Sequence, residues 1–227
     1  MRTNLRQTML STFLATLVAA GALGCASTSN TTKGAAVGVA TGAVVGGVIG
    51  NQTGSTTRGA IIGAALGGVA GGLIGNQMDQ RAKQIEEDVP EAIVERVGEG
   101  IHVTFPSGLL FDFDSAVIRS TAAGNLSELA RNLGQYDDSN LMIAGHTDAV
   151  GSSGYNQDLS DQRAQSAARY LVSHGVSRHI ATVGLGEREP VSSNGSEAGR
   201  QANRRVEIAI YASAALQEEA RRQAAGR

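Results

Sequence analysis

The sequence predicts an α+β domain with a mixed β-sheet, helices on one face and the element order βαβαβ(α)β, preceded by a helical hairpin built on glycine. Glycine recurs at every fourth position in residues 34–50 and again in residues 59–75. The composition then changes abruptly, because no Asp or Glu precedes Asp79. Beyond that point, alternating apolar stretches and amphipathic helical stretches follow one another, which is typical of strands and helices in one sheet-based domain.

Residues 34–50 and 59–75, here called the first and second glycine ladders, are copies of one pattern, GAAVGVATGAVVGGVIGNQ and GAIIGAALGGVAGGLIGNQ. Residues four apart share one face of a helix, so each ladder presents a strip that another backbone can approach closely. Glycine disfavours an isolated helix in water by roughly 1 kcal/mol per residue, which indicates close packing in an apolar setting. The alternative is a flexible Gly/Ala linker, but the strict period and the Val, Ile and Leu between the glycines favour helices.

The two ladders are expected to form an antiparallel hairpin over residues 34–77, with a turn at residues 51–58. Each helix would be about 25 Å long, slightly short of a hydrocarbon core of about 30 Å. Membrane insertion, packing of the hairpin on itself and oligomerisation remain open.

Residues 1–24 are predicted to be an export signal, since Arg2 and Arg6 precede a mostly apolar stretch from residue 9 to 23. Gly24 and Cys25 resemble the end of a bacterial lipobox, so the mature chain is expected to begin at a lipidated Cys25. Residues 25–33 are a polar tether. A secreted protein with an incidental cysteine is the alternative. Because aspartate does not follow the cysteine, the resemblance favours the outer membrane.

The length of 227 residues allows one ordinary domain plus appendages. The formal net charge of −2 gives no support to a nucleic-acid role, and the single cysteine excludes an intrachain disulfide. Residues 78–100 are expected to form a linker helix and the first strand of a hairpin, residues 101–213 the folded domain and residues 214–227 a charged tail. The elements predicted from local patterns are a helix at 81–88; strands at 93–97, 101–105 and 109–113; a helix at 120–133; a strand at 140–146; a helix from 156 or 160 to 174; and strands at 180–185 and 205–211.

Four separate blocks carry a family resemblance: FDFDSAVIRS, GHTDAVGSSGYNQDLSDQRA, GLGEREPVSSN and NRRVEI. In this order and spacing they resemble the OmpA-like peptidoglycan-binding domain, found at the C-terminal end of OmpA, Pal and MotB. The resemblance covers residues 109–211. With the signal, cysteine and glycine ladders in front, the whole chain is similar to YiaD-type outer-membrane lipoproteins.

Asp148 and Arg163 are the leading candidates for a binding site. Asp148 follows a buried strand, where open α/β sheets present their ligand sites. Arg163 shares a four-residue row with Leu159, Ala167 and Leu171, so it is expected on the inward face of its helix, where a guanidinium needs an anionic partner. The resemblance implies that Asp148 takes the ammonium and Arg163 the carboxylate of diaminopimelate in the peptidoglycan stem peptide. An internal Asp148–Arg163 ion pair that only braces the fold is the alternative.

The resemblance adds further ligand-binding candidates, some with structural alternatives. Phe113 and Asp114 would otherwise be a strand end and a helix-capping acid, and Ser160 would otherwise be an N-cap. Arg205 is an alternative to Arg204, with the other of the two solvated. The full set of added candidates is Phe113, Asp114, Thr147, Asn156, Leu159, Ser160 and Arg204.

Catalysis is not predicted. His146 and Asp148 lie close in sequence, but no glycine pattern of a nucleophile elbow surrounds a serine and no second carboxylate pair suggests a glycosidase. The same two residues lack further metal ligands at suitable spacing, so no metal or cofactor is expected. His102, His174 and His179 are scattered and are interpreted as surface or satisfied residues.

The sequence therefore predicts an outer-membrane lipoprotein that binds peptidoglycan without chemistry, through a domain in the periplasm. Its expected partners are peptidoglycan, the outer membrane and other copies of itself through the ladders. Two alternatives remain: a glycine-zipper membrane oligomer whose wall binding only positions it, and an assembly factor for outer-membrane proteins that uses the domain as an anchor.

Overall fold

The computed structural model describes residues 55–65, 71–178 and 180–226. The signal over residues 1–24, the Cys25 anchor, the tether and the first glycine ladder lie outside these residues. Within the described ranges, no helix combines the length and apolar character that a membrane span requires.

A five-stranded mixed sheet forms the centre of the domain, in the order β1-β2-β5-β3-β4. The pair β3 and β4 is parallel and the other neighbouring pairs are antiparallel, which confirms the mixed sheet. The helix α6 (Ser153–Ser173) connects the parallel pair, as a parallel connection requires. The strands are β1 (Ile93–Val97), β2 (Gly100–Pro106), β3 (Ser139–Gly145), β4 (Ile180–Gly184) and β5 (Arg205–Ala212).

Three helices cover one face of this sheet: α3 (Gly71–Asp88), α5 (Ser120–Gly134) and α6. Alternate residues of a strand point to the same face, and on β2 and β5 the set facing these helices is apolar throughout. Leu126 and Leu129 of α5 and Leu171 of α6 complete the core. The buried strand residues of this core are Ile101, Val103, Phe105, Leu141, Ile143, Val206, Ile208 and Ile210.

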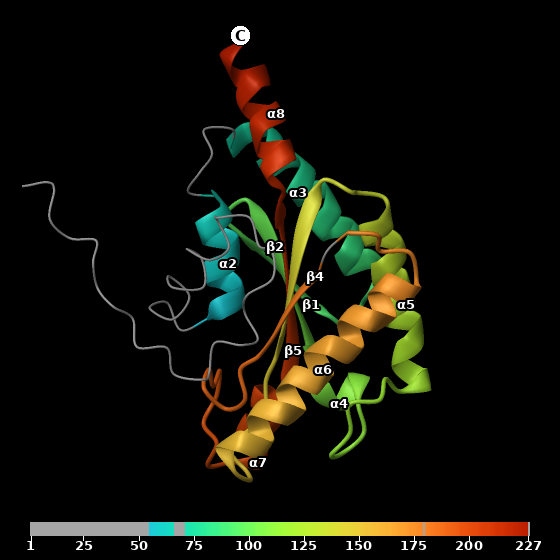
Figure 1. Ribbon diagram of the computed structural model, residues 1–227, viewed down its shortest axis with the longest axis vertical. Coiled ribbons are helices and arrows are strands. Elements are labelled where there is room, and N and C mark those ends of the chain that lie inside the picture. Colours follow the sequence, from blue (N-terminus) through green and yellow to red (C-terminus); the bar gives the residue numbers. More distant parts are fainter. Residues whose placement is uncertain (1–54, 66–70, 179, 227) are drawn as a thin grey trace, which may run out of the picture. The chain divides into compact units, whose positions relative to one another are not determined.

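The described parts of the second glycine ladder belong to two helices. Its first part belongs to α2 (Thr56–Ala65), which packs on Ala209 and Tyr211, and its last glycines belong to α3, on the opposite face of the sheet. Figure 1 shows α2 and the helices α5 and α6 on opposite sides of the strands. Both faces therefore carry helices, where the sequence analysis expected only one.

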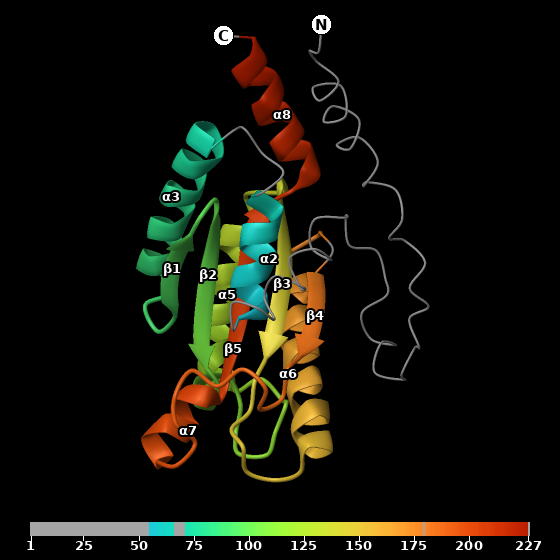
Figure 2. The same ribbon diagram turned by 90° about the vertical axis from the view of Figure 1, so that its left-hand side faces the viewer.

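A specific glycine lets α2 lie close to the sheet. A Cβ added to Gly100 would come 2.4 Å from Ile61 and 2.7 Å from the carbonyl oxygen of Ile210, so any side chain there would push α2 away. Ala60 and Ala64 bury their small side chains in the same cluster. The small residues of this ladder segment thus pack against a sheet, and Figure 2 shows α2 lying in front of β2, β5 and β3.

Two further elements differ from the sequence prediction. The strand expected at residues 109–113 is replaced by the short helix α4 (Ser107–Leu110), and Phe111 makes only a single bridge to Ile118. Pro106 ends β2 and, having no N–H to donate, favours a break in strand pairing. The short helix α7 (Glu197–Asn203) was not expected at all.

Most of the remaining predicted elements are confirmed to within a few residues, and the helix expected at 81–88 is the second half of the longer α3. The β1–β2 hairpin, the helix at 120–133, and the strands β3, β4 and β5 lie where the patterns predicted them. The charged tail contains the helix α8 (Ala214–Ala225), whose Leu216 and Ala220 join the core.

Candidate functional site

Asp148 lies just beyond the carboxyl end of β3, as predicted, and is only 8% exposed. Its Oδ1 atom accepts a hydrogen bond from the backbone N–H of Val150 at 2.9 Å. Its Oδ2 atom forms an ion pair with Nη1 of Arg204. Asn156 donates to the backbone carbonyl of Asp148 at 3.2 Å, which fixes the main chain that carries this side chain.

Arg163 comes from the middle of α6 and is 5% exposed. Its Nε donates to the carbonyl of Ser115 at 3.0 Å, and its guanidinium carbon lies 5.4 Å from the centre of the Phe111 ring, a cation–π distance. Burial, and secondly the positive charge of Arg204, lower the pKa of Arg163. Among the described residues, no carboxylate oxygen lies within 4.0 Å of its guanidinium. Arg163 is therefore a desolvated cation without an ionic partner in this part of the chain.

Asp148 and Arg163 do not form the internal ion pair that was the alternative to ligand binding. Asp148 pairs with Arg204, whose Nη2 also bonds Glu197 at 2.7 Å. Arg205 points to the other face, is buried and bonds Glu207 at 2.6 Å, because successive residues of a strand face opposite sides. Arg204 is therefore the arginine beside Asp148. Arg205 was expected to be solvated in that case, and this expectation is wrong because Arg205 is buried.

Ser160 is not the N-cap of its helix. The helix α6 begins at Ser153, earlier than predicted, and Ser152 is the cap, accepting from the N–H of Tyr155. The hydroxyl of Ser160 is buried and accepts from the N–H of Gly186 at 2.9 Å. A Cβ on Gly145 would lie 2.1 Å from the carbonyl oxygen of Ser160, so this glycine lets β3 and α6 approach closely.

Thr147 and Asn156 line the start of the loop that carries Asp148. The backbone N–H of Thr147 donates to the Gly186 carbonyl, while its buried hydroxyl has no hydrogen-bond partner among the described residues. Asn156 also donates to Glu187 at 2.6 Å. Leu159 is half-buried on the same helix.

Phe113 and Asp114 lie in the loop between α4 and α5, which also supplies the Ser115 carbonyl to Arg163. The capping alternative for Asp114 is wrong, because α5 begins after Arg119. Asp114 has a left-handed backbone with φ of 56°. Its negative charge favours the protonated form of Arg163 and so opposes part of the lowering of the Arg163 pKa. Phe113 is 99% exposed, so the structure gives it no packing role in the domain.

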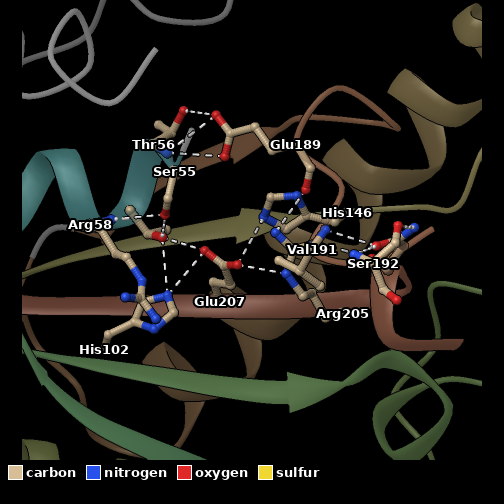
Figure 3. A network of polar contacts seen from close by, with 12 residues as sticks. Ser55, Thr56, Arg58, His102, His146, Glu189, Val191, Ser192, Arg205 and Glu207 are labelled. Atoms are coloured by element: carbon tan, nitrogen blue, oxygen red, sulfur yellow. Dashed lines mark hydrogen bonds and ion pairs between the residues drawn. The ribbon is translucent and has the colours of Figure 1, made fainter. Parts of the chain in front are cut away.

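A second polar cluster, on the α2 face of the sheet, was not predicted (Figure 3). Glu207 lies at its centre and accepts from Thr57 and from Arg205, with Nε2 of His102 at 3.1 Å. Nε2 of His146 lies 3.7 Å from Glu207 in the same cluster. No local signal could reveal this cluster, because its members come from α2, β2 and β5, far apart in sequence.

A cavity of about 720 Å³ also lies on the α2 face rather than beside Asp148. Arg58 and Glu95 line it and form an ion pair with each other. Its other walls include Ile93 and Pro106 from the β1–β2 hairpin and Ala198 from α7. Its charged groups pair with one another, so it is not the site that the motifs of the sequence indicate.

The mixed five-stranded sheet with its helices fits the OmpA-like fold that the sequence resembles. Residues 110–204 match the model of the OmpA family, and residues 1–79 match that of the YMGG-like Gly-zipper. The chain therefore contains a segment similar to the OmpA family, behind a segment similar to the YMGG-like Gly-zipper.

Two curated relatives are informative. The chain is 37% identical over 118 residues to the probable lipoprotein YiaD of Escherichia coli, which covers 52% of this chain and 54% of the relative. It is 49% identical over 86 residues to the peptidoglycan-binding protein ArfA of Mycobacterium tuberculosis, which covers 37% and 26%. The chain thus spans about half or less of the length of these relatives.

A solved structure shares the fold over nearly its whole length. The cell wall anchor of the T6SS from Pseudomonas aeruginosa matches with a TM-score of 0.52 and 28% identity, covering 60% of this chain and 97% of that one. The match confirms the OmpA-like arrangement of sheet and helices.

Proposed function

We propose that this protein binds peptidoglycan non-covalently and links the outer membrane to the cell wall. The observation that carries the proposal is Arg163, a buried guanidinium with no carboxylate partner among the described residues, in the same site as the carboxylate of Asp148. A cation held out of water in this way favours an anionic ligand group. The similarity to a peptidoglycan-binding protein and to a cell wall anchor supports the same class of ligand.

Diaminopimelate of the stem peptide fits both charges, because one of its carbons carries an ammonium and a carboxylate. In the proposed complex, Asp148 accepts from the ammonium and Arg163 donates to the carboxylate. The Val150 N–H holds the Asp148 carboxylate, Asn156 holds the backbone carbonyl of Asp148, and the Ser115 carbonyl holds Arg163. Each charge-assisted contact contributes about 1.5–3 kcal/mol.

The arrangement of side chains supports binding rather than catalysis. The carboxylate near Nε2 of His146 is that of Glu207, at 3.7 Å, and no hydrogen bond or ion pair joins His146 to Asp148 among the described residues. Both carboxylate oxygens of Asp148 are engaged, Oδ1 by the Val150 N–H and Oδ2 by Arg204.

The proposal places a lipid anchor on Cys25 and the wall-binding domain in the periplasm. The glycine-zipper oligomer remains the alternative function, but part of the second ladder is used by α2 to pack on the sheet, which favours an internal role for that part.

Two conservative substitutions test the site. Asp148→Asn keeps the acceptor for the Val150 N–H but removes the charge, and Arg163→Lys keeps the charge but removes the planar fork. Each is expected to weaken sedimentation of the full-length protein with purified sacculi by roughly tenfold or more. Asp158→Asn and Arg169→Lys are matched controls, since both residues are exposed on α6.

Thermal unfolding of each variant checks that the fold is intact. Folded Asp148→Asn and Arg163→Lys proteins that sediment with sacculi as wild type does would show that the ligand does not use these charges.

A further inference from the structure

We propose that Glu197 is a positioning residue of the wall site: it draws Arg204 away from Asp148 when the ligand ammonium arrives. The proposal rests on the peptidoglycan-binding function proposed above. It concerns the state of Asp148 before binding, because the carboxylate expected to receive an ammonium is already paired with a cation of the protein.

Arg204 is shared between two carboxylates. Its Nη1 bonds Oδ2 of Asp148, and its Nη2 bonds Oε1 of Glu197 at 2.7 Å. Since Oδ1 of Asp148 is engaged by the Val150 N–H, Oδ2 is the oxygen for which Arg204 and an incoming ammonium compete. Binding of the ligand ammonium therefore requires Arg204 to release Asp148 and to keep only its contact with Glu197.

Glu197 is well placed to hold the released guanidinium. It is the first residue of α7, and its other oxygen, Oε2, accepts from Arg200 at 3.0 and 2.7 Å. Arg200 is itself fixed by a bond to the carbonyl of Asn194 at 3.0 Å. These contacts keep the Glu197 carboxylate oriented toward Arg204 whether or not Asp148 is occupied.

The charges around Asp148 make this release necessary. Arg204 and Arg163 already act on each other, since the charge of Arg204, after burial, helps to lower the pKa of Arg163. A ligand ammonium on Asp148 would add a third cation to the same site. Glu197 offsets this repulsion because it offers Arg204 a second anion outside the ligand position.

The proposal predicts a defined defect for Glu197→Gln. Without the second carboxylate, Arg204 is left with Asp148 alone and competes more strongly with the ligand. Binding of the full-length protein to purified sacculi is expected to weaken by about twofold to fivefold, the range of one exposed ion pair. Glu86→Gln, an exposed acid on α3, is the charge-matched control and is expected to bind as wild type does.

A double-mutant cycle separates action through Arg204 from simple loss of negative charge. In an Arg204→Gln background, Glu197→Gln is expected to change sacculus binding by less than about twofold, since the competitor is gone. Arg204→Gln removes the competing cation together with the partner of Asp148, so the binding of this single variant is the baseline from which the second effect of Glu197→Gln is read.

Two outcomes would overturn the inference: wild-type binding by Glu197→Gln, or an undiminished Glu197→Gln defect in the Arg204→Gln background. Asp148→Asn is measured in parallel. If Asp148→Asn and Arg163→Lys also bind as wild type does, the peptidoglycan site itself fails, which is a different result from failure of the role of Glu197.

Discussion

At the scale of single residues, the two charges of the proposed site differ in how the fold prepares them. Asp148 is held by backbone and by Arg204, so its charge is already compensated before any ligand binds. Arg163 has a carbonyl and an aromatic ring beside it, but no carboxylate within 4.0 Å among the described residues; Asp114 and Asp148 act on it only from farther away. The cost of burying the guanidinium is thus offset only in part within this site, which favours a carboxylate ligand.

His146 gives a residue-scale prediction about pH. Burial lowers the pKa of His146 below its ordinary value of 6.5, although Glu207 opposes the shift. The folded protein therefore keeps this imidazole neutral while the unfolded chain protonates it, so stability is lost as the pH falls through about 6.5. The midpoint temperature of thermal unfolding is expected to decrease as the pH is lowered from 7.5 to 5.5. His146→Gln is expected to make this decrease smaller.

His174→Gln is the control, because His174 is exposed and stacked on Tyr170. An unchanged slope in the His146 variant would contradict the assignment.

Glu207 contributes at lower pH: burial alone would raise its pKa, but contacts with His102 and His146 and the charge of Arg205 hold the pKa well below its usual range. Its contribution is therefore lost only below about pH 4.5.

Sequence patterns could predict Asp148 and Arg163, because a strand end and a helix face are local features. The partners of these residues could not be predicted in the same way. Arg204 reaches Asp148 across 56 positions, and His102 reaches Glu207 across 105. Such pairs form only when the sheet order brings β2, β3 and β5 together, which periodicity does not reveal.

At the scale of elements, α2 is the least expected feature. The same small residues that predict a helix–helix strip also suit close packing on a sheet, and the choice depends on tertiary surfaces such as Gly100. The helix at 120–133 and the β1–β2 hairpin were predictable because their apolar faces and turn are encoded locally. The strand expected at 109–113 failed because Pro106 ends the preceding pairing.

Thr57 tests whether α2 is an integral part of the domain. Thr57→Val removes a buried donor to Glu207 while keeping the side-chain shape, and the loss of a hydrogen bond to a charged group destabilises by about 1.5–3 kcal/mol. Urea unfolding of the full-length protein is expected to show that loss. Thr121→Val, at an exposed position of α5, is the control, and equal stability of the two variants would show that α2 does not dock through this contact.

At the scale of the whole molecule, the account joins a lipid anchor at Cys25 to a wall-binding domain. Cys25→Ser is expected to abolish incorporation of a labelled fatty acid, because the thiol is the proposed acylation site. Wild-type labelling of that variant would contradict the anchor and leave the domain without its proposed tether.

The central claim is recognition of an ammonium and a carboxylate on one carbon, and the most direct test compares sacculi that differ only in that group. Lysine in place of diaminopimelate keeps the ammonium but lacks the carboxylate that Arg163 is proposed to bind. The wild-type protein is expected to bind diaminopimelate sacculi roughly tenfold or more tightly than lysine sacculi. Arg163→Gln is expected to remove most of that difference. Equal wild-type binding to both kinds of sacculi would contradict the proposed site.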